Sequence, residues 1–173
     1  MNKKYLGTVT IIIFVLIFSI LVGCSSENSD DKEAIQVATK YKETEYKVDD
    51  YHKVTLPEGI QAKADETKPY VTNDFYNSQM ANRVTGLPLQ IAQSEKSSIK
   101  ADKIHFESAQ NEESGVKSLS YDLVLELTND QGTSKEIKIT GVLTMTKVNE
   151  EWKVKYDVNH NLNELSNLAQ AKG

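Results

Sequence analysis

The chain has 173 residues, a length typical of one domain with a short appendage. It carries 20 Lys and Arg against 25 Asp and Glu, so its formal net charge is −5. This balance argues against nucleic acid as a partner, because a basic face is needed to meet phosphates. The single Cys cannot form an internal disulfide, and no Cys/His cluster has the spacing of zinc ligands. No phosphate-binding or nucleophile motif is present, so we predict no metal, no cofactor and no catalytic residue.

The N-terminus has the three parts of a secretory signal. Lys3 and Lys4 form a basic start, residues 11–22 form an apolar run, and Gly23 and Cys24 follow. The apolar run is shorter than the roughly 20 residues that a membrane-spanning helix needs. Residues 1–23 are therefore predicted to be a signal peptide.

The end of this segment, Leu21-Val22-Gly23-Cys24, resembles the lipobox of bacterial lipoproteins. In that family a diacylglycerol is added to the Cys sulfur, and a peptidase cleaves before the Cys. The resemblance implies lipidation of Cys24, cleavage between Gly23 and Cys24, and a protein held at the extracytoplasmic face of the cell membrane. An uncleaved anchor with an incidental Cys is the alternative. One acyl chain binds a membrane marginally, whereas two or three on Cys24 would hold the protein persistently.

A short tether is expected between the lipid and the folded part. Residues 25–30 are small and polar and offer no apolar side chain to a core, which is typical of a flexible spacer. Six extended residues reach about 20 Å, so the domain would stay close to the membrane. We predict that residues 24–30 are the lipidated Cys and tether and that residues 31–173 are one extracytoplasmic domain.

The first helix is predicted from Asp30 to Asp49. Asp30 and Glu33 have capping-box spacing. Five residues fall near one face of this helix: Ala34, Ile35, Ala38, Tyr41 and Val48. The other face, with Lys40, Glu43 and Lys47, is expected to be solvated.

The next region is less regular. Pro57-Glu58-Gly59 signals a turn, so residues 50–68 are predicted to be a loop with room for one helical turn. Pro69 is expected to start a second short helix, with Val71, Phe75 and Met80 facing inward.

After Leu89 the apolar period changes to two, which predicts four strands. Ile104 and Phe106 share a face of the first strand, Ile99–Ser108. The inward residues of the second strand are Leu119, Tyr121, Leu123, Leu125 and Leu127. Those of the third strand are Ile137, Ile139, Gly141, Leu143 and Met145, and those of the fourth are Trp152, Val154, Tyr156 and Val158. Gly141 in mid-strand predicts a bulge or a sharp bend. Residues 161–172 are predicted to form a short helix or a frayed tail.

This order predicts an α+β fold in which N-terminal helices pack on a curved antiparallel sheet of about four strands. Over residues 31–158 it resembles the cystatin-like cone known from nuclear transport factor 2 and its bacterial relatives. The resemblance rests on element order and on the final strand, which opens with Glu151-Trp152-Lys153-Val154. This fold hosts enzymes, binding modules and assembly parts, so it implies no single function.

Enzymes of that family use an Asp or His inside the cone as a general base. Here His105 and Asp122 each alternate with inward apolar residues, so both are expected to face solvent, without a catalytic role. Aromatic side chains that could line a pocket include Tyr41, Tyr121, Trp152 and Tyr156. Filling the core, with their polar ends at its edge, is the alternative for the same side chains.

The leading prediction is a lipid-anchored extracytoplasmic interaction module without catalysis. Its partners would be the membrane, through diacylglycerol on Cys24, and another membrane or surface protein. Members of the cone family occur in secretion and conjugation machines, so the specific hypothesis is a part or regulator of conjugative transfer or of its exclusion. A small-ligand carrier or enzyme that uses the interior of the cone is the alternative. The single Arg among many Lys fits an AT-rich Gram-positive genome.

Overall fold

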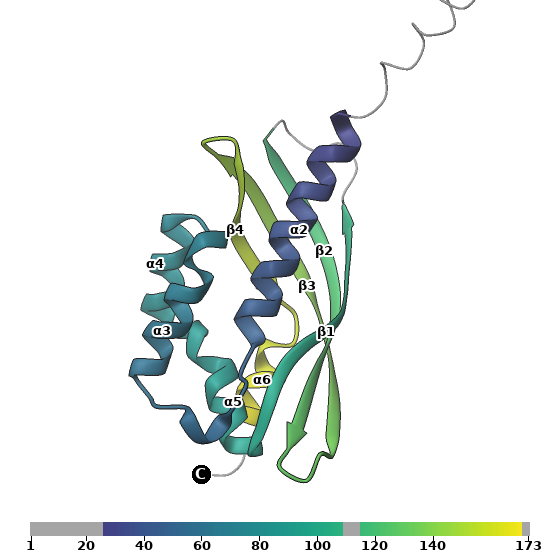
Figure 1. Cartoon of the computed structure of the whole chain (residues 1–173). Helices are drawn as coiled ribbons and strands as arrows, with labels where there is room; N and C mark the ends of the chain where they lie inside the picture. The colour runs from purple at the N-terminus through teal and green to yellow at the C-terminus, as the bar shows by residue number, and fades with distance from the viewer. Residues whose placement is uncertain (1–25, 109–114, 171–173) are drawn as a thin grey trace, which may run out of the picture. The chain divides into compact units, whose positions relative to one another are not determined.

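The computed structural model describes residues 26–108 and 115–170, which form helices followed by a four-stranded antiparallel sheet (Figure 1). The chain divides into two units, residues 1–32 and 33–173, and only the beginning of the first helix is described in the first unit. The predicted signal peptide, its cleavage position and Cys24 lie outside the described residues. Within the described ranges, no helix is both long and apolar enough to cross a membrane.

The elements follow one another in the order helices, sheet, helix. They are α2 (Ser26–Tyr46), the 3-10 turn η2 (Tyr51–Lys53), α3 (Glu58–Thr67), η3 (Lys68–Tyr70), α4 (Asn73–Asn82), η4 (Val84–Gly86), α5 (Leu87–Glu95), β1 (Ser97–Ser108), β2 (Val116–Asn129), β3 (Ser134–Val148), β4 (Glu151–Asn159) and α6 (Leu162–Gln170). The α+β fold predicted from the sequence is confirmed.

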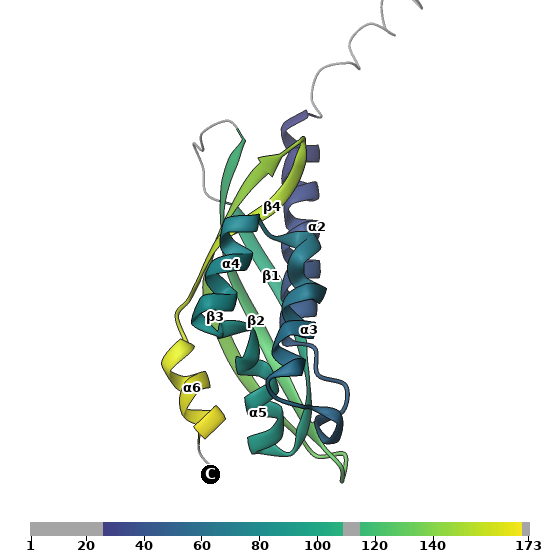
Figure 2. The same cartoon turned by 90° about the vertical axis from the view of Figure 1, so that its left-hand side faces the viewer.

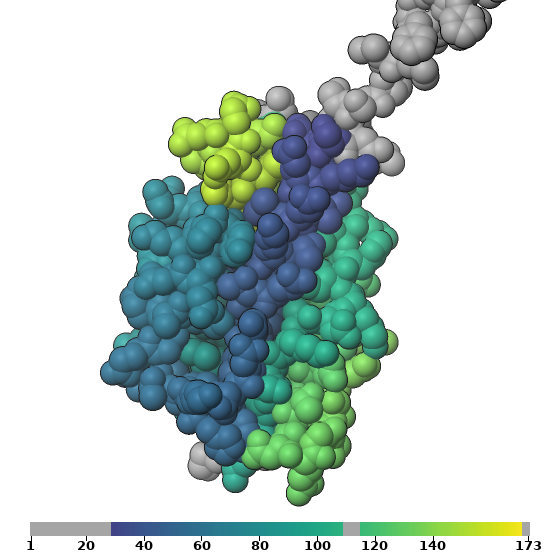
Figure 3. Space-filling model, in the orientation of Figure 1, coloured from purple at the N-terminus to yellow at the C-terminus, as the bar shows by residue number. Residues whose placement is uncertain are grey.

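Helix α2 lies along the inner face of the sheet (Figure 1). Ala34, Ala38 and Tyr41 are fully buried. Lys40 and Glu43 on the outer face of α2, and Lys47 just past its end, are exposed as predicted. Figure 3 shows this helix reaching the surface between α3 and α4 on one side and β1 on the other.

The bounds of α2 differ from those predicted. The helix begins at Ser26, four residues before the predicted start at Asp30 and within the segment predicted to be a tether. A polar composition does not prevent a further helical turn, because acidic residues such as Asp30 and Asp31 are favoured at a helix N-terminus. The helix ends at Tyr46, three residues before the predicted end.

Two helices were missed by the sequence analysis. Helix α3 occupies part of the predicted loop, and α5 occupies residues 87–95, where strand periodicity was expected to begin. Helices this short are stabilised by tertiary packing more than by their own periodicity. Ala64 of α3 and Ile91 and Ala92 of α5 are fully buried. The short helix expected to start at Pro69 starts instead at Asn73, as α4, and Pro69 lies in η3. Thr72 caps α4 by accepting a hydrogen bond from the backbone N–H of Phe75.

The strands are ordered β1-β2-β3-β4, so β1 and β4 form the edges. The sheet curves around α2, and α4 lies beside β4 (Figure 2). In β2 and β3 every second residue faces the core, as the period-two pattern predicted. Residues 149 and 150 both have positive φ, the conformation of a tight two-residue hairpin turn between β3 and β4.

Both edge strands contain a β-bulge. In β1 the pairing with β2 shifts between Asp102 and His105, and Lys103 has a φ of 50°. In β4 the pairing with β3 shifts so that Met145 opposes Val154 and Thr144 opposes Tyr156. One extra residue reverses the alternation of the strand after it.

The bulge in β4 corrects a prediction. Tyr156 and Val158 were expected to share the inward face of Trp152 and Val154, but they are 58% and 57% exposed. Asp157, opposite the buried Leu143, points inward instead.

Gly141 pairs in regular register with Tyr121 of β2, so the bulge predicted there is absent. A Cβ at this position would lie 2.4 Å from the Tyr121 hydroxyl oxygen and 2.4 Å from the Val158 carbonyl oxygen. Gly141 therefore makes room for the close approach of the Tyr121 ring.

Candidate functional site

A lysine is fully buried between α2 and the sheet. Lys42 has no solvent-exposed surface, and its Nζ donates to Glu45 Oε2 at 2.9 Å, Asp157 Oδ2 at 2.5 Å and the Tyr121 hydroxyl at 3.2 Å. An ammonium has three N–H donors, so all of them are used. We call Lys42, Glu45 and Asp157 the buried charge cluster.

Tyrosines surround this cluster and complete its hydrogen bonds. The Tyr121 hydroxyl donates to Asp157 Oδ1 at 3.0 Å, and the Tyr41 hydroxyl donates to Glu45 Oε1 at 3.3 Å. The Lys42 Nζ also lies 4.3 Å from the centre of the Tyr121 ring, within the range of a cation–π interaction. The low-polarity surroundings strengthen these contacts and make an unpaired charge there costly.

The charges in the cluster do not balance. Burial opposes the charge on Lys42, but attraction by Asp157 and Glu45 outweighs it, and the pKa of Lys42 is raised well above its usual value. Burial raises the pKa of Glu45, and repulsion from Asp157 adds to the effect, against the attraction of Lys42. One ammonium satisfies one carboxylate fully and must be shared with the second.

A pocket of about 340 Å³ adjoins the cluster. Its walls come from α2, α4, α5, β4 and the start of α6, and Glu45 and Asp157 both reach it, with side chains 13% and 7% exposed. Its other lining residues are Tyr46, Phe75, Ser78, Gln79, Asn82, Val84, Leu87, Pro88, Tyr156, Val158, Asn159 and Leu162. We call it the α4–β4 pocket. A mostly apolar concavity with a few polar groups and shifted pKa values is the usual form of a binding site.

Gln79 brings to this pocket a polar atom without a hydrogen-bond partner among the described residues. Gln79 on α4 is 5% exposed; its Nε2 donates to the Tyr41 hydroxyl at 2.8 Å. Its Oε1 is buried and accepts no hydrogen bond from the described residues. A buried acceptor left unpaired carries a desolvation cost, which a hydrogen-bond donor from a ligand would remove.

The four aromatic residues predicted to line a pocket do not share one. Tyr41 and Tyr121 meet at the buried charge cluster and are 0% and 4% exposed, so they belong to the core. Tyr156 lines the α4–β4 pocket. Trp152 is buried at the other end of β4. The Nζ atoms of Lys117 and Lys147 lie 5.6 and 5.3 Å from the centre of its ring.

His105 and Asp122 face solvent, as predicted, and oppose each other on β1 and β2. His105 Nε2 lies 3.6 Å from Glu107 Oε1, and both side chains are exposed. In the described part of the chain, no group of three or more His, Cys, Asp and Glu side chains is placed to hold a metal ion.

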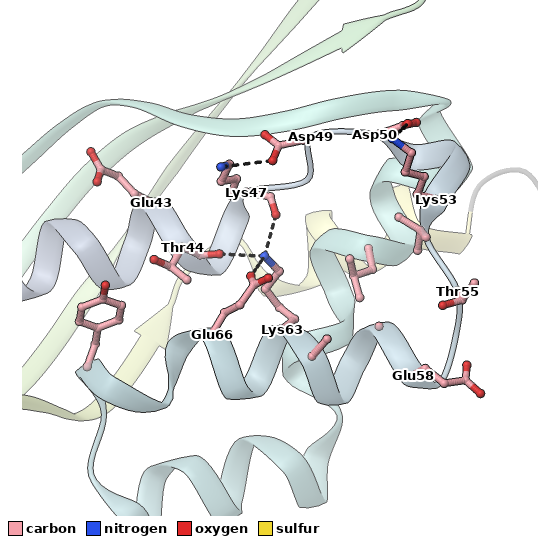
Figure 4. A pocket seen from close by; sticks show the side chains of 15 residues that line it. Glu43, Thr44, Lys47, Asp49, Asp50, Lys53, Thr55, Glu58, Lys63 and Glu66 are labelled. Atoms are coloured by element: carbon pink, nitrogen blue, oxygen red, sulfur yellow. Dashed lines mark hydrogen bonds and ion pairs between the residues drawn. The ribbon is translucent and has the colours of Figure 1, made fainter.

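A second, larger groove lies between the C-terminal end of α2 and α3 (Figure 4). Its three cations are engaged within the groove: Lys47 pairs with Asp49, Lys53 with Asp50, and Lys63 with Glu66. Lys63 also donates to the carbonyl oxygens of Thr44 and Lys47 at 3.2 and 2.8 Å, so it caps the end of α2. These contacts are structural, and the α4–β4 pocket remains the candidate site.

Sequence analysis missed Lys42, Glu45, Gln79 and Asp157. Lys42 and Glu45 have helical spacing to each other, but nothing in that spacing distinguishes them from an exposed ion pair. In regular alternation with the predicted inward residues Tyr156 and Val158, Asp157 would face solvent, and the bulge in β4 turns it inward.

No protein-family model matches the chain, and no curated protein matches it. Solved structures show similar folds. A periplasmic fragment of TraM is 12% identical with a TM-score of 0.52, over 75% of this chain and 96% of that fragment. An IcmL-like type IV secretion system protein from Legionella pneumophila is 14% identical with a TM-score of 0.55, over 79% of this chain and 93% of that protein. These matches show a shared helix-plus-antiparallel-sheet fold.

Proposed function

We propose that this protein is a non-catalytic interaction module of a membrane-associated secretion or transfer machine. The observation that carries the proposal is the fold shared with an IcmL-like type IV secretion system protein and with a periplasmic TraM fragment, across more than nine-tenths of each. The resemblance of Leu21-Val22-Gly23-Cys24 to a lipobox supports an attachment to the membrane through lipid on Cys24, with the domain on the extracytoplasmic face. A role in conjugative transfer or in its exclusion is the specific form of the proposal.

The packing against the inner face of the sheet favours an interaction role. The alternative, a ligand carrier that uses the interior of a cone, needs an open space there. Large buried side chains occupy that interior, among them Tyr41, Leu119, Leu125, Ile139 and Met145. The α4–β4 pocket lies at the edge of the sheet, next to surface side chains that a protein partner could reach.

The test is cross-linking in the cells that produce the protein. A lysine-reactive cross-linker is applied to intact cells, and the proteins captured with the full chain are identified by mass spectrometry. Recovery of one dominant component of a secretion or conjugation machine is the expected result. Capture of no such component, together with unchanged transfer after deletion of the gene, would show that the proposal is wrong.

A further inference from the structure

The mouth of the α4–β4 pocket is bordered by exposed apolar side chains. Tyr156 and Val158 of β4 are 58% and 57% exposed, and Leu162 of α6 is 42% exposed. They are three of the five large apolar residues that are exposed in the described part of the chain. Single exposed apolar residues are ordinary, but a group around a concave site marks a surface that another molecule covers.

The floor of the same pocket has an excess of hydrogen-bond acceptors. The carboxylates of Glu45 and Asp157 share one ammonium, which leaves a net of one negative charge when both are ionised. Lys42 has no further N–H to give, and Gln79 Oε1 has no donor from the described residues. The missing group is therefore a donor, and a cationic one satisfies both the acceptors and the charge.

We propose that the α4–β4 pocket receives a segment of a partner protein in which one Lys or Arg is flanked by apolar side chains. The long aliphatic stem of such a residue suits the apolar wall, and its charged end reaches Glu45, Asp157 and Gln79. The flanking apolar side chains cover Tyr156, Val158 and Leu162. An acidic segment would meet two carboxylates, and a small free amine would leave the apolar rim uncovered.

This inference rests on the proposed function, because it names the chemistry of the partner that the interaction module binds. Its test is site-specific photo-cross-linking of the full chain in the cells that produce it. Benzoylphenylalanine is placed at Tyr156 on the pocket rim or, as the matched control, at His105, which is also exposed, on the far edge strand. The cross-linked peptide is then sequenced. The expected result is a partner peptide from Tyr156 with a Lys or Arg between apolar residues, and no such product from His105.

Charge dependence provides the second readout. Glu45→Gln removes one carboxylate from the pocket floor, whereas Glu43→Gln removes one from the exposed face of the same helix. We expect the yield from position 156 to fall about tenfold or more with Glu45→Gln and to stay unchanged with Glu43→Gln. Should Glu45→Gln impair folding, Leu162→Ser provides an exposed rim change that leaves the charge cluster intact, and it should also lower the yield.

The outcomes separate this inference from the proposed function. A peptide without Lys or Arg, a peptide from a second copy of this chain, or a yield that none of the pocket variants changes would overturn the inference. If the lysine-reactive reagent captures a machine component but position 156 captures nothing, the inference is wrong and the proposed function stands. If neither captures a machine component, both are wrong.

Discussion

Lys42 is a charged residue with no exposed surface in the interior of this protein. It lies on α2 with its ammonium group between two carboxylates that are themselves almost buried. Removing water from three charges is costly, and the cost is offset only while each charge keeps its partners. The sequence around Lys42 mixes Lys and Glu as a solvated helix face does, so the burial of Lys42 could not be inferred from local pattern.

Replacing Lys42 should therefore destabilise the fold strongly. Lys42→Met leaves Glu45 and Asp157 facing each other without a cation, and we expect a loss of about 3–5 kcal/mol in the free energy of unfolding. The free energy of unfolding is measured by urea denaturation, with circular dichroism as the signal. The matched control is Lys40→Met on the exposed face of α2, which should change stability by about 0.5 kcal/mol or less. Equal losses in the two variants would contradict the buried role of Lys42.

Glu45 should give stability an unusual pH dependence. Its pKa is raised by burial and by Asp157, against the attraction of Lys42, so the folded state holds the Glu45 proton more tightly than the unfolded chain does. Stability from this group is then lost as the pH rises from about 4.3, the ordinary glutamate pKa, through the raised value.

The measurement compares the free energy of unfolding of the wild type and the Glu45→Gln variant across that pH range. The wild type should lose stability relative to the variant as the pH rises, because only the wild type carries the titrating group. A difference that stays constant with pH would show that the Glu45 pKa is not raised.

At the scale of elements, the bulge in β4 decides which side chains form the pocket. Before it, Trp152 and Val154 face the core; after it, Asp157 faces the core, and Tyr156 and Val158 face outward. One extra residue thus brings a carboxylate to Lys42 and turns two apolar side chains toward the rim of the α4–β4 pocket.

Truncating a side chain on the inner side of the β3–β4 hairpin should lower the free energy of unfolding more than truncating one on its outer side. Met145→Ala, at a fully buried position of β3, should cost about 2–5 kcal/mol of unfolding free energy. Tyr156→Ser should cost about 0.5 kcal/mol or less, because that side chain is largely in solvent. Chemical denaturation of both variants checks the expectation. A loss of several kcal/mol for Tyr156→Ser would mean that β4 continues in regular alternation without the bulge.

At the scale of the whole molecule, the proposed lipid on Cys24 and the pocket of the folded unit would have separate functions. The first would set where the protein resides, and the second would set what it binds. Because the net charge of the chain is negative, its surface would not itself draw it to an anionic membrane, so attachment would depend on the lipid.

Cys24→Ala should abolish lipid attachment and leave the precursor unprocessed. Metabolic labelling of cells with palmitate, followed by isolation of the protein, measures the label on the wild type and the variant. The neighbouring Ser25→Ala substitution is the control and should keep full labelling. Label retained by the Cys24→Ala variant would show that another residue accepts the lipid.

The sequence by itself determined that helices precede four strands. It also determined the inward side of β2 and β3, because their regular pairing preserves a period of two. It also predicted the exposed face of α2 and the solvent position of His105 and Asp122. Only the tertiary structure decided the helices α3 and α5, which depend on packing, and the inward turn of Asp157, which depends on the register between β3 and β4. The candidate site combines side chains from α2, α4 and β4. Local sequence does not predict their contacts, because these segments are far apart in the chain and meet only when it folds.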